Sequence, residues 1–304
     1  MKYREVIFMV VSPTFASLMI ILNSAILALV KFSKNQTKCR KLIYIMNLSV
    51  ADLFLGVNII LVKAMSVVEK SHPQKNSIKN VRHFLQGKLM PLSLYISVLS
   101  VAVITFDRLL MVLQPIKYMR IRHWKKRAVC VCVWIMATST VLGMYFLVND
   151  NKQEYILTPC LVLLTVVFVS ASYFKIQRHL SSINSITLNR RSGGGVGNKA
   201  TGITLSERRF TQFCFQSFVL FVVCWLPFSV YGILYVTNMI DTWSYYLDFR
   251  YTCHIMAFSN SVFSPILFLF HFKRLQRSKS TTNKYEESVA TSTFSELPDI
   301  NNVQ

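Results

Sequence analysis

Seven long apolar runs follow one another along the chain, and they constrain its fold more than any other feature. A transmembrane helix needs roughly 20 apolar residues to cross about 30 Å of hydrocarbon. Runs of this length occur at about 6–30, 42–68, 84–113, 128–148, 155–179, 210–238 and 246–270. Charged residues make up only 15% of the sequence, against about 25% in an average soluble chain. The sequence therefore predicts an all-α membrane protein, a bundle of seven transmembrane helices.

The basic residues lie mainly between the apolar runs, which is how membrane topology distributes them. If the N-terminus is extracellular, most of the 34 lysines and arginines fall on the cytoplasmic side. We therefore expect a multi-pass protein of the plasma membrane with an extracellular N-terminus and a cytoplasmic C-terminus. The net charge of +21 is explained by this topology, so we expect no nucleic acid among the partners.

Residues 1–279 are expected to form the transmembrane domain, with a short amphipathic helix after the seventh run. Phe268, Phe272 and Leu275 share one helical face there, an arrangement typical of a helix lying on the inner leaflet. Residues 280–304 are rich in Ser, Thr and Glu. This composition predicts a disordered cytoplasmic tail.

Several polar residues lie inside the apolar runs. Asp52 is about ten residues, or roughly 15 Å, into the second run and hence near the bilayer midplane. Ser97 lies about three helical turns before Arg108, on the same face. Further polar groups in the first and seventh runs are Asn23, Asn260, Ser261 and Ser264. Hydrogen bonding between helices is one explanation, but an intramembrane carboxylate with oxygen ligands at matching depth favours a cation or proton site.

At these positions the chain resembles a class A (rhodopsin-like) G-protein-coupled receptor, over about residues 8–278. The matching motifs, in family order, are Asn23, Asn47-Leu48-Ser49-Val50-Ala51-Asp52, Asp107-Arg108-Leu109 with Pro115, Trp134, Tyr173, Phe221 with Cys224-Trp225-Leu226-Pro227, Asn260-Ser261 and Ser264-Pro265-Ile266-Leu267-Phe268. Each motif alone is weak, whereas their common order and spacing are highly specific.

The resemblance implies a G-protein-coupling site formed by Asp107, Arg108, Glu207 and Tyr173. Asp107 and Glu207 would hold Arg108 by charge-assisted pairing in the inactive arrangement. Activation would release Arg108 as span six moves outward. The implied partners are a heterotrimeric G protein and an extracellular ligand, with membrane lipids around the bundle. A receptor kinase and arrestin are expected to act on the Ser/Thr-rich tail.

The resemblance also implies an activation switch formed by Phe221, Trp225, Pro227 and Pro265. Trp225 would lie at the floor of the ligand cavity and transmit ligand contact to Phe221. Pro227 would be the hinge, because its missing N–H weakens the helix locally.

A sodium site is implied as well, and an allosteric sodium ion is the one cofactor expected. Its ligands would come from Asp52, Ser97, Asn260, Ser261 and Ser264.

The chain departs from the family pattern at three positions. His83 replaces the span-three cysteine, so the usual outer disulfide is not expected. Thr165 stands where span five has proline, and Phe268 where span seven has tyrosine. Without that tyrosine hydroxyl, an active-state water bridge to Tyr173 is not expected.

The outer ends of the helices indicate the kind of ligand. Met90 stands where receptors for amines carry an aspartate, and Phe258 where opsins carry the retinal lysine. The basic residues near the first outer loop, with Lys63, would attract anions, although lysines there can also extend to headgroups or water. Candidate ligand-binding residues are Lys63, Lys88, Met90, Phe228, Ser229 and His254.

Two alternatives to a ligand-activated receptor remain. One is a chemosensory, odorant-like receptor of the same fold, although the Cys-Trp-Leu-Pro string is generally absent from the main vertebrate odorant family. The other is a seven-helix ion-coupled transporter or channel, but the sequence shows neither an internal repeat nor the broken helices typical of transporters. Under each of these hypotheses we expect that the protein is not an enzyme.

Overall fold

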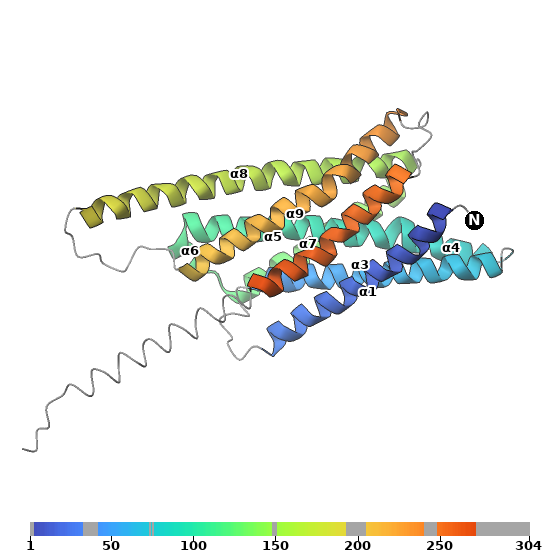
Figure 1. Ribbon diagram of the computed structural model, residues 1–304, viewed down its shortest axis with the longest axis horizontal. Helices are drawn as coiled ribbons and strands as arrows, with labels where there is room; N and C mark the ends of the chain where they lie inside the picture. Colours follow the sequence, from blue (N-terminus) through green and yellow to red (C-terminus); the bar gives the residue numbers. More distant parts are fainter. Residues whose placement is uncertain are drawn as a thin grey trace, which may run out of the picture.

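The computed structural model is a bundle of long helices aligned along one axis (Figure 1). It describes residues 3–32, 42–72, 74, 76–147, 151–192, 205–239 and 248–271. Seven helices within these residues are long and apolar enough to cross a membrane, and these residues contain no strand. The elements are α1 (Tyr3–Lys31), α3 (Ile43–Ser71), α4 (Asn76–Phe84), the π-helical turn η1 (Leu85–Leu89), α5 (Met90–Leu113), α6 (Pro115–Met119), α7 (His123–Leu147), α8 (Asn151–Ser192), α9 (Leu205–Val236) and a last helix, Asp248–His271.

The central helix is α5, which packs against α3, α7, α8 and α9. A polar network joins three helices near its middle. Trp134 of α7 donates a hydrogen bond of 3.0 Å to Asn47 of α3, and Asn47 donates one of 2.9 Å to Ser100 of α5. Interhelical hydrogen bonds of this kind help to hold membrane bundles together.

Close approach of α1 to α3 depends on Gly56. A Cβ atom at this position would lie 3.0 Å from Ile20 Cγ1 and 3.1 Å from the Ala16 carbonyl oxygen. Small residues allow helix backbones to approach in membranes, where packing replaces the hydrophobic effect as the source of association.

The third span begins earlier than the apolar run at 84–113 predicts. Residues 76–83, expected to belong to the outer loop region, form most of α4, and η1 joins α4 to α5. Hydropathy marks only the membrane-embedded part of a helix, whereas α4 is polar. The wide turn has a local cause: Pro91 has no N–H to donate, and the Met90 N–H bonds to the carbonyl of Leu85, five residues back.

The fifth span is also longer than predicted, since α8 extends from Asn151 to Ser192 and reaches past the other helices at the left of Figure 1. Because its second half is polar, the span predicted from hydropathy ended at residue 179. The helix continues because this segment contains neither proline nor glycine before Gly193. The amphipathic helix and the tail expected after the seventh span lie in residues 272–304, outside the described residues.

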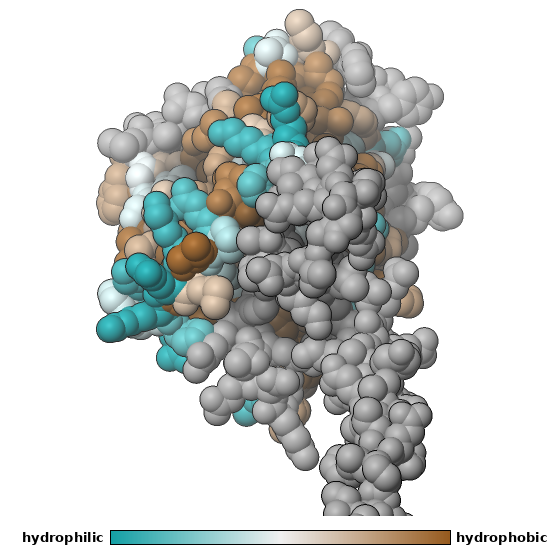
Figure 2. Space-filling model, turned by 90° about the vertical axis from the view of Figure 1, so that its left-hand side faces the viewer, coloured by the Kyte–Doolittle hydropathy of each residue, from teal (hydrophilic) through white to brown (hydrophobic). Residues whose placement is uncertain are grey.

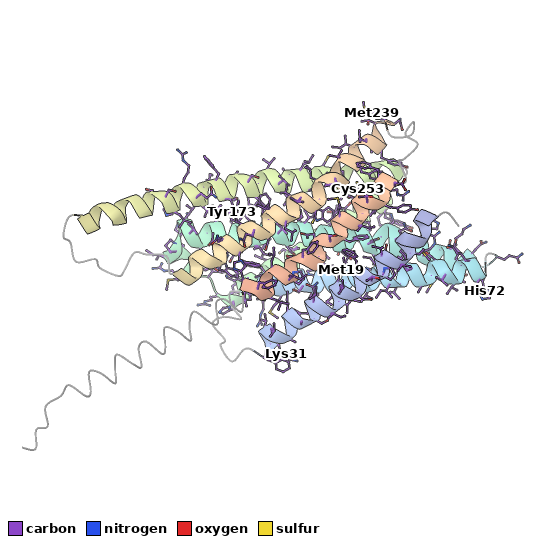
Figure 3. The ribbon with its side chains drawn as sticks, in the orientation of Figure 1. Met19, Lys31, His72, Tyr173, Met239 and Cys253 are labelled. Carbon is purple, nitrogen blue, oxygen red and sulfur yellow. The ribbon has the colours of Figure 1, made fainter. Side chains whose placement is uncertain are left out.

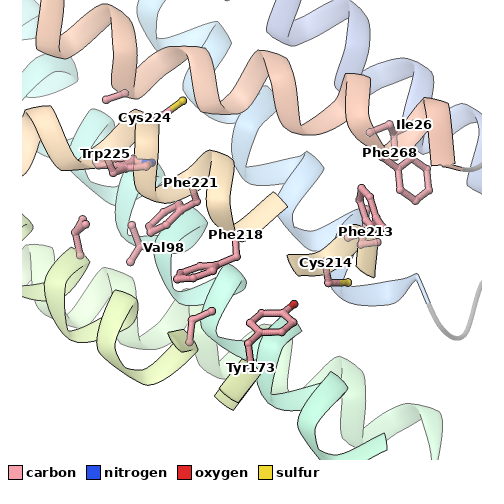
Figure 4. Packing of buried hydrophobic residues seen from close by; sticks show 14 of the residues in the cluster. Ile26, Val98, Tyr173, Phe213, Cys214, Phe218, Phe221, Cys224, Trp225 and Phe268 are labelled. Carbon is pink, nitrogen blue, oxygen red and sulfur yellow. The ribbon is translucent and has the colours of Figure 1, made fainter. Parts of the chain in front are cut away.

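Aromatic residues fill the space between α8, α9 and the last helix. Trp225, Phe221 and Phe218 follow one another along α9, and Phe213 faces Phe268 with ring centroids 5.8 Å apart (Figure 4). Figure 3 places His72 and Met239 toward the same end of the bundle, away from Lys31. The long axis of the bundle therefore separates two ends, and each carries a different site.

Candidate functional site

The buried carboxylate of Asp52 lies midway along the bundle and joins three helices. Ser97 of α5 donates a hydrogen bond of 3.1 Å to Asp52 Oδ1, and Ser261 of the last helix donates one of 2.8 Å to the same oxygen. Asn23 of α1 donates to the carbonyl oxygen of Ser261 at 3.2 Å. Within the described part of the chain, no basic side chain forms an ion pair with Asp52.

A small cavity of about 40 Å³ adjoins Asp52. Asn260 and Ser264, which the sequence assigns to the same site, also line it. Holding one water requires roughly 10–15 Å³ of such space, so the cavity has room for a small ion or a few waters. Its polar lining offers carboxylate, hydroxyl and amide oxygens, the ligand type that small hard cations bind. The five predicted residues therefore converge, through hydrogen bonds or a shared cavity.

At the end of the bundle near α6, Asp107 and Arg108 form a buried ion pair. The Arg108 guanidinium donates to Asp107 Oδ2, and the Tyr118 hydroxyl donates to the same oxygen at 3.0 Å. Burial raises the pKa of Tyr118, which keeps this phenol protonated as a donor. Figure 2 views this end, where hydrophilic side chains lie among apolar ones.

Lys126 of α7 is a second cation on the same carboxylate. Its Nζ donates to Asp107 Oδ1 at 2.8 Å and to the Tyr118 hydroxyl oxygen at 2.7 Å. The sequence analysis did not assign Lys126 to this site. Lys126 lies between Lys125 and Arg127, and three consecutive basic residues are typical of a cytoplasmic loop. A signal was present: Lys126 precedes Trp134 by eight residues, about two helical turns, and so shares its inward face.

On α9, the ring of Phe210 contacts Arg108, with the guanidinium carbon 4.6 Å from its centroid. The predicted partner Glu207 lies one turn earlier on α9, but its side chain is outside the described residues. Tyr173 of α8, also assigned to coupling, is buried and packs against Phe215 and Phe218 of α9. Two neighbouring helices thus face the Arg108 region with aromatic side chains.

A continuous column of rings connects the outer half of the bundle with the Asp52 cavity. His254 contacts Phe228 at 5.2 Å between centroids, Phe228 contacts Trp225 at 5.8 Å, and Trp225 contacts Phe221 at 5.9 Å. Trp225 lines a large cavity that also contains Lys63 and Lys70, called the outer cavity below. Phe221 lines the small cavity at Asp52, called the inner cavity. The predicted switch residues therefore separate two cavities. Pro227 lies within α9 on the same stretch, and Pro265 lines the inner cavity.

The outer cavity has a volume of about 710 Å³, within the range of small-molecule sites. Four of the six predicted ligand-binding residues line it: Lys63, Met90, Phe228 and His254. Further basic residues on its wall are Lys70, Lys79, Arg82 and Arg250. Arg250 was not predicted, although it precedes His254 by one helical turn and so shares its face.

The other two predicted ligand-binding residues are not on this wall. Lys88 lies over the Tyr145 ring of α7, 5.2 Å from its centroid, and the Ser229 hydroxyl donates to the Trp225 carbonyl oxygen at 3.1 Å. The prediction for Lys88 assumed a regular α-helix. A π-helical turn contains one extra residue, so the side chains before and after η1 are rotated by about 100° relative to a regular α-helix.

The described residues contain six cysteines, and all are free thiols. The outer end is instead joined by an ion pair between α4 and α3, in which Arg82 Nε lies 2.5 Å from Glu69 Oε2.

Comparison with known proteins agrees with this architecture. The family described as 7 transmembrane receptor (rhodopsin family) matches residues 22–268. The chain is 23% identical to the type-2 angiotensin II receptor of Ovis aries, over 77% of this chain and 68% of that receptor. It is 21% identical to the allatostatin-A receptor of Bombyx mori, over 82% and 72%, and 24% identical to galanin receptor 2b of Danio rerio, over 83% and 69%.

These matches cover most of the chain and include the Asp52, Arg108 and Trp225 regions. They favour a receptor over the transporter or channel considered from the sequence. The chain belongs to the rhodopsin family of seven-transmembrane receptors, multi-pass proteins of the plasma membrane that signal through heterotrimeric G proteins and are not enzymes.

Proposed function

We propose that this receptor binds an anionic extracellular ligand in the outer cavity and activates heterotrimeric G proteins by an outward movement of α9. The observation that carries the ligand class is the charge of the cavity wall. Among the described residues, five basic side chains line it, namely Lys63, Lys70, Lys79, Arg82 and Arg250, together with one carboxylate, that of Glu69. Glu69 is already paired with Arg82. A wall of one sign around a low-dielectric cavity concentrates ions of the opposite sign.

The inner half of the same cavity is apolar and supports a ligand with a hydrophobic body. Leu94, Trp225, Phe228 and Phe258 line it. Along α3, the apolar Ile59 and the basic Lys70 are eleven residues apart, or roughly 16 Å at 1.5 Å per residue. The cavity therefore changes from basic to apolar along its depth, which suits an amphiphilic acid.

Two buried donors on this wall also support a bound ligand. The Ser12 hydroxyl and the Trp225 indole N–H are buried and have no hydrogen-bond partner within the described residues. Buried polar groups are normally paired with protein, water or ligand. An acceptor atom on the ligand would satisfy the indole, which can only donate.

Coupling is proposed to involve Arg108. In the described arrangement its guanidinium is held by Asp107 and covered by Phe210 of α9. Movement of α9 away from α5 would uncover it for the G protein, with Pro227 as the hinge. Glu207 is proposed as a further acidic partner of Arg108 in the closed form.

Sodium is proposed as an allosteric ion at Asp52. Ser97, Asn260, Ser261 and Ser264 supply oxygens around the inner cavity, and a buried carboxylate without a cation is unfavourable. Sodium there would stabilise the arrangement in which α3, α5 and the last helix meet.

The proposal places the N-terminus outside the cell, because the basic segments then lie mostly on the cytoplasmic side. The Ser/Thr-rich tail would be phosphorylated by a receptor kinase and would then recruit arrestin.

Nucleotide exchange on G proteins, in membranes that carry the receptor, tests the ligand class. We expect aliphatic or aromatic carboxylic acids to stimulate exchange and their methyl esters, which have the same apolar bodies, to be inactive. Stimulation by amines, or equal potency of acid and ester, would contradict an anionic ligand.

A further inference from the structure

We infer that Lys126 is a positioning residue for activation: it keeps Asp107 ionised and in place when Arg108 leaves, so that opening of the cytoplasmic end requires no proton uptake there. The inference rests on the proposed movement of α9. It concerns a contact between α7 and α5 that lies outside the family motifs found in the sequence.

The two cations hold different oxygens of Asp107. Lys126 binds Oδ1 at 2.8 Å, whereas Arg108 binds Oδ2. Departure of Arg108 therefore leaves the Lys126 contact geometrically intact. The Tyr118 hydroxyl, 3.0 Å from Oδ2, would remain as a neutral donor to the vacated oxygen.

Two aromatic contacts of Lys126 come from helices other than α9, the helix proposed to move. Its ammonium lies 4.3 Å from the Tyr118 ring centroid and 5.5 Å from that of Tyr44, which belong to α6 and α3. Arg108, in contrast, lies against Phe210 of α9. Movement of α9 thus removes the Phe210 contact from Arg108 and leaves the Tyr44 and Tyr118 contacts of Lys126 in place.

A carboxylate left buried without a cation is strongly disfavoured and binds a proton instead. Within the described part of the chain, the titratable groups around Asp107 come from five helices: Arg108 on α5, Tyr118 on α6, Lys126 on α7, Tyr44 on α3 and Cys214 on α9. Phenols and a thiol cannot neutralise a carboxylate. Among these groups, Lys126 is therefore the cation that remains after Arg108 departs.

Lys126→Met tests this role, because methionine retains an apolar stem and removes the charge. Lys125→Met is the matched control, since the adjacent Lys125 is exposed and lies over the Trp124 ring instead. Lys126→Arg tests rescue by a retained charge. The purified receptor in lipid nanodiscs would carry labels, introduced as unnatural amino acids, at the exposed positions Met119 and Gln212. Their separation reports opening of α9 without a ligand.

The measured quantity is the ratio of open to closed receptor between about pH 5 and 8. In Lys126→Met the open state binds one more proton than the closed state, so this ratio should rise as the pH falls, by up to about tenfold per pH unit. Lys125→Met and Lys126→Arg should follow the wild type. Adding Asp107→Asn to Lys126→Met should abolish the extra pH dependence, because the titrating group is gone.

Identical pH profiles for Lys126→Met and Lys125→Met would overturn the inference, as would a pH dependence of Lys126→Met that survives Asp107→Asn. If Lys126→Met does not fold, Lys126→Gln removes the same charge and has the same expected profile. A label separation that stays fixed even in Asp107→Asn with excess G protein would instead contradict the proposed movement of α9, and with it the basis for a role of Lys126.

Discussion

The hydroxyl of Ser261 donates a hydrogen bond of 2.8 Å to Oδ1 of Asp52, although the two residues are 209 positions apart in the sequence. Ser97 donates to the same oxygen. Both hydroxyls therefore gather on one side of the carboxylate, beside a cavity that Asn260 and Ser264 also line. The seventh span is thus tied to α3 and α5 beside the cavity at Asp52.

Sodium is expected to lower basal nucleotide exchange, since an ion bound at Asp52 would stabilise the arrangement in which these helices meet. Asp52→Asn should abolish this dependence because it removes the formal charge that holds the ion. Exchange would be measured as sodium replaces potassium at constant ionic strength, which holds general screening fixed. An undiminished sodium response in Asp52→Asn would exclude the site.

Phe210→Ala is expected to raise basal exchange. The ring covers the Arg108 guanidinium at 4.6 Å, and a cation–π contact contributes about 0.5–2 kcal/mol. Its loss should increase the fraction of open receptor roughly two- to thirtyfold. Phe263→Ala is the matched control, because this ring is exposed on the outer surface of the last helix. Equal basal activity in both variants would show that Phe210 does not hold the closed form.

Lys63→Ala is expected to weaken an acidic agonist by about 1–3 kcal/mol, or roughly five- to 150-fold in potency, because it removes a charged hydrogen bond. Lys63→Arg should weaken it less. Lys88→Ala provides the control at the same end of the bundle, since Lys88 lies over Tyr145 and not on the cavity wall. Dose–response curves for nucleotide exchange measure all three variants. Similar losses in Lys63→Ala and Lys88→Ala would contradict a direct contact.

Gly56→Ala is expected to lower the melting temperature of the purified receptor. The added Cβ would meet Ile20 and the Ala16 backbone at about 3 Å, and overpacking of this kind destabilises by about 1–3 kcal/mol. Gly143→Ala should be neutral or slightly stabilising, because nothing lies within 4 Å of a Cβ there and alanine favours a helix by up to about 1 kcal/mol. Thermal denaturation in detergent distinguishes the two, and equal melting temperatures would contradict close packing of α1 on α3.

Much of the fold followed from the sequence because hydropathy acts locally. Seven apolar runs predict seven spans without knowledge of their neighbours, and the family motifs then predict which residues face the interior. The convergence of Asp52 with Ser97 and Ser261 could be anticipated in this way, since depth along a helix depends only on residue count. The family motifs likewise predicted Trp225 at the floor of the ligand cavity, with Phe221 one helical turn before it.

Contacts that depend on the rotation and length of whole helices could not be anticipated. From hydropathy, the fifth span was predicted to end at residue 179 and the third to begin at residue 84. Polar turns of the same helices lie beyond these bounds, and hydropathy does not distinguish them from loops. The π-helical turn at Leu85–Leu89 directs Lys88 toward α7, and α7 presents Lys126 to Asp107 from another element. The sequence alone therefore determined the number of spans and the depth of their polar residues, which are properties of single segments. Only the tertiary structure decided the partners of Lys88 and Lys126 and the contact of Arg108 with Phe210, because each of these contacts depends on how two or more helices are rotated against each other.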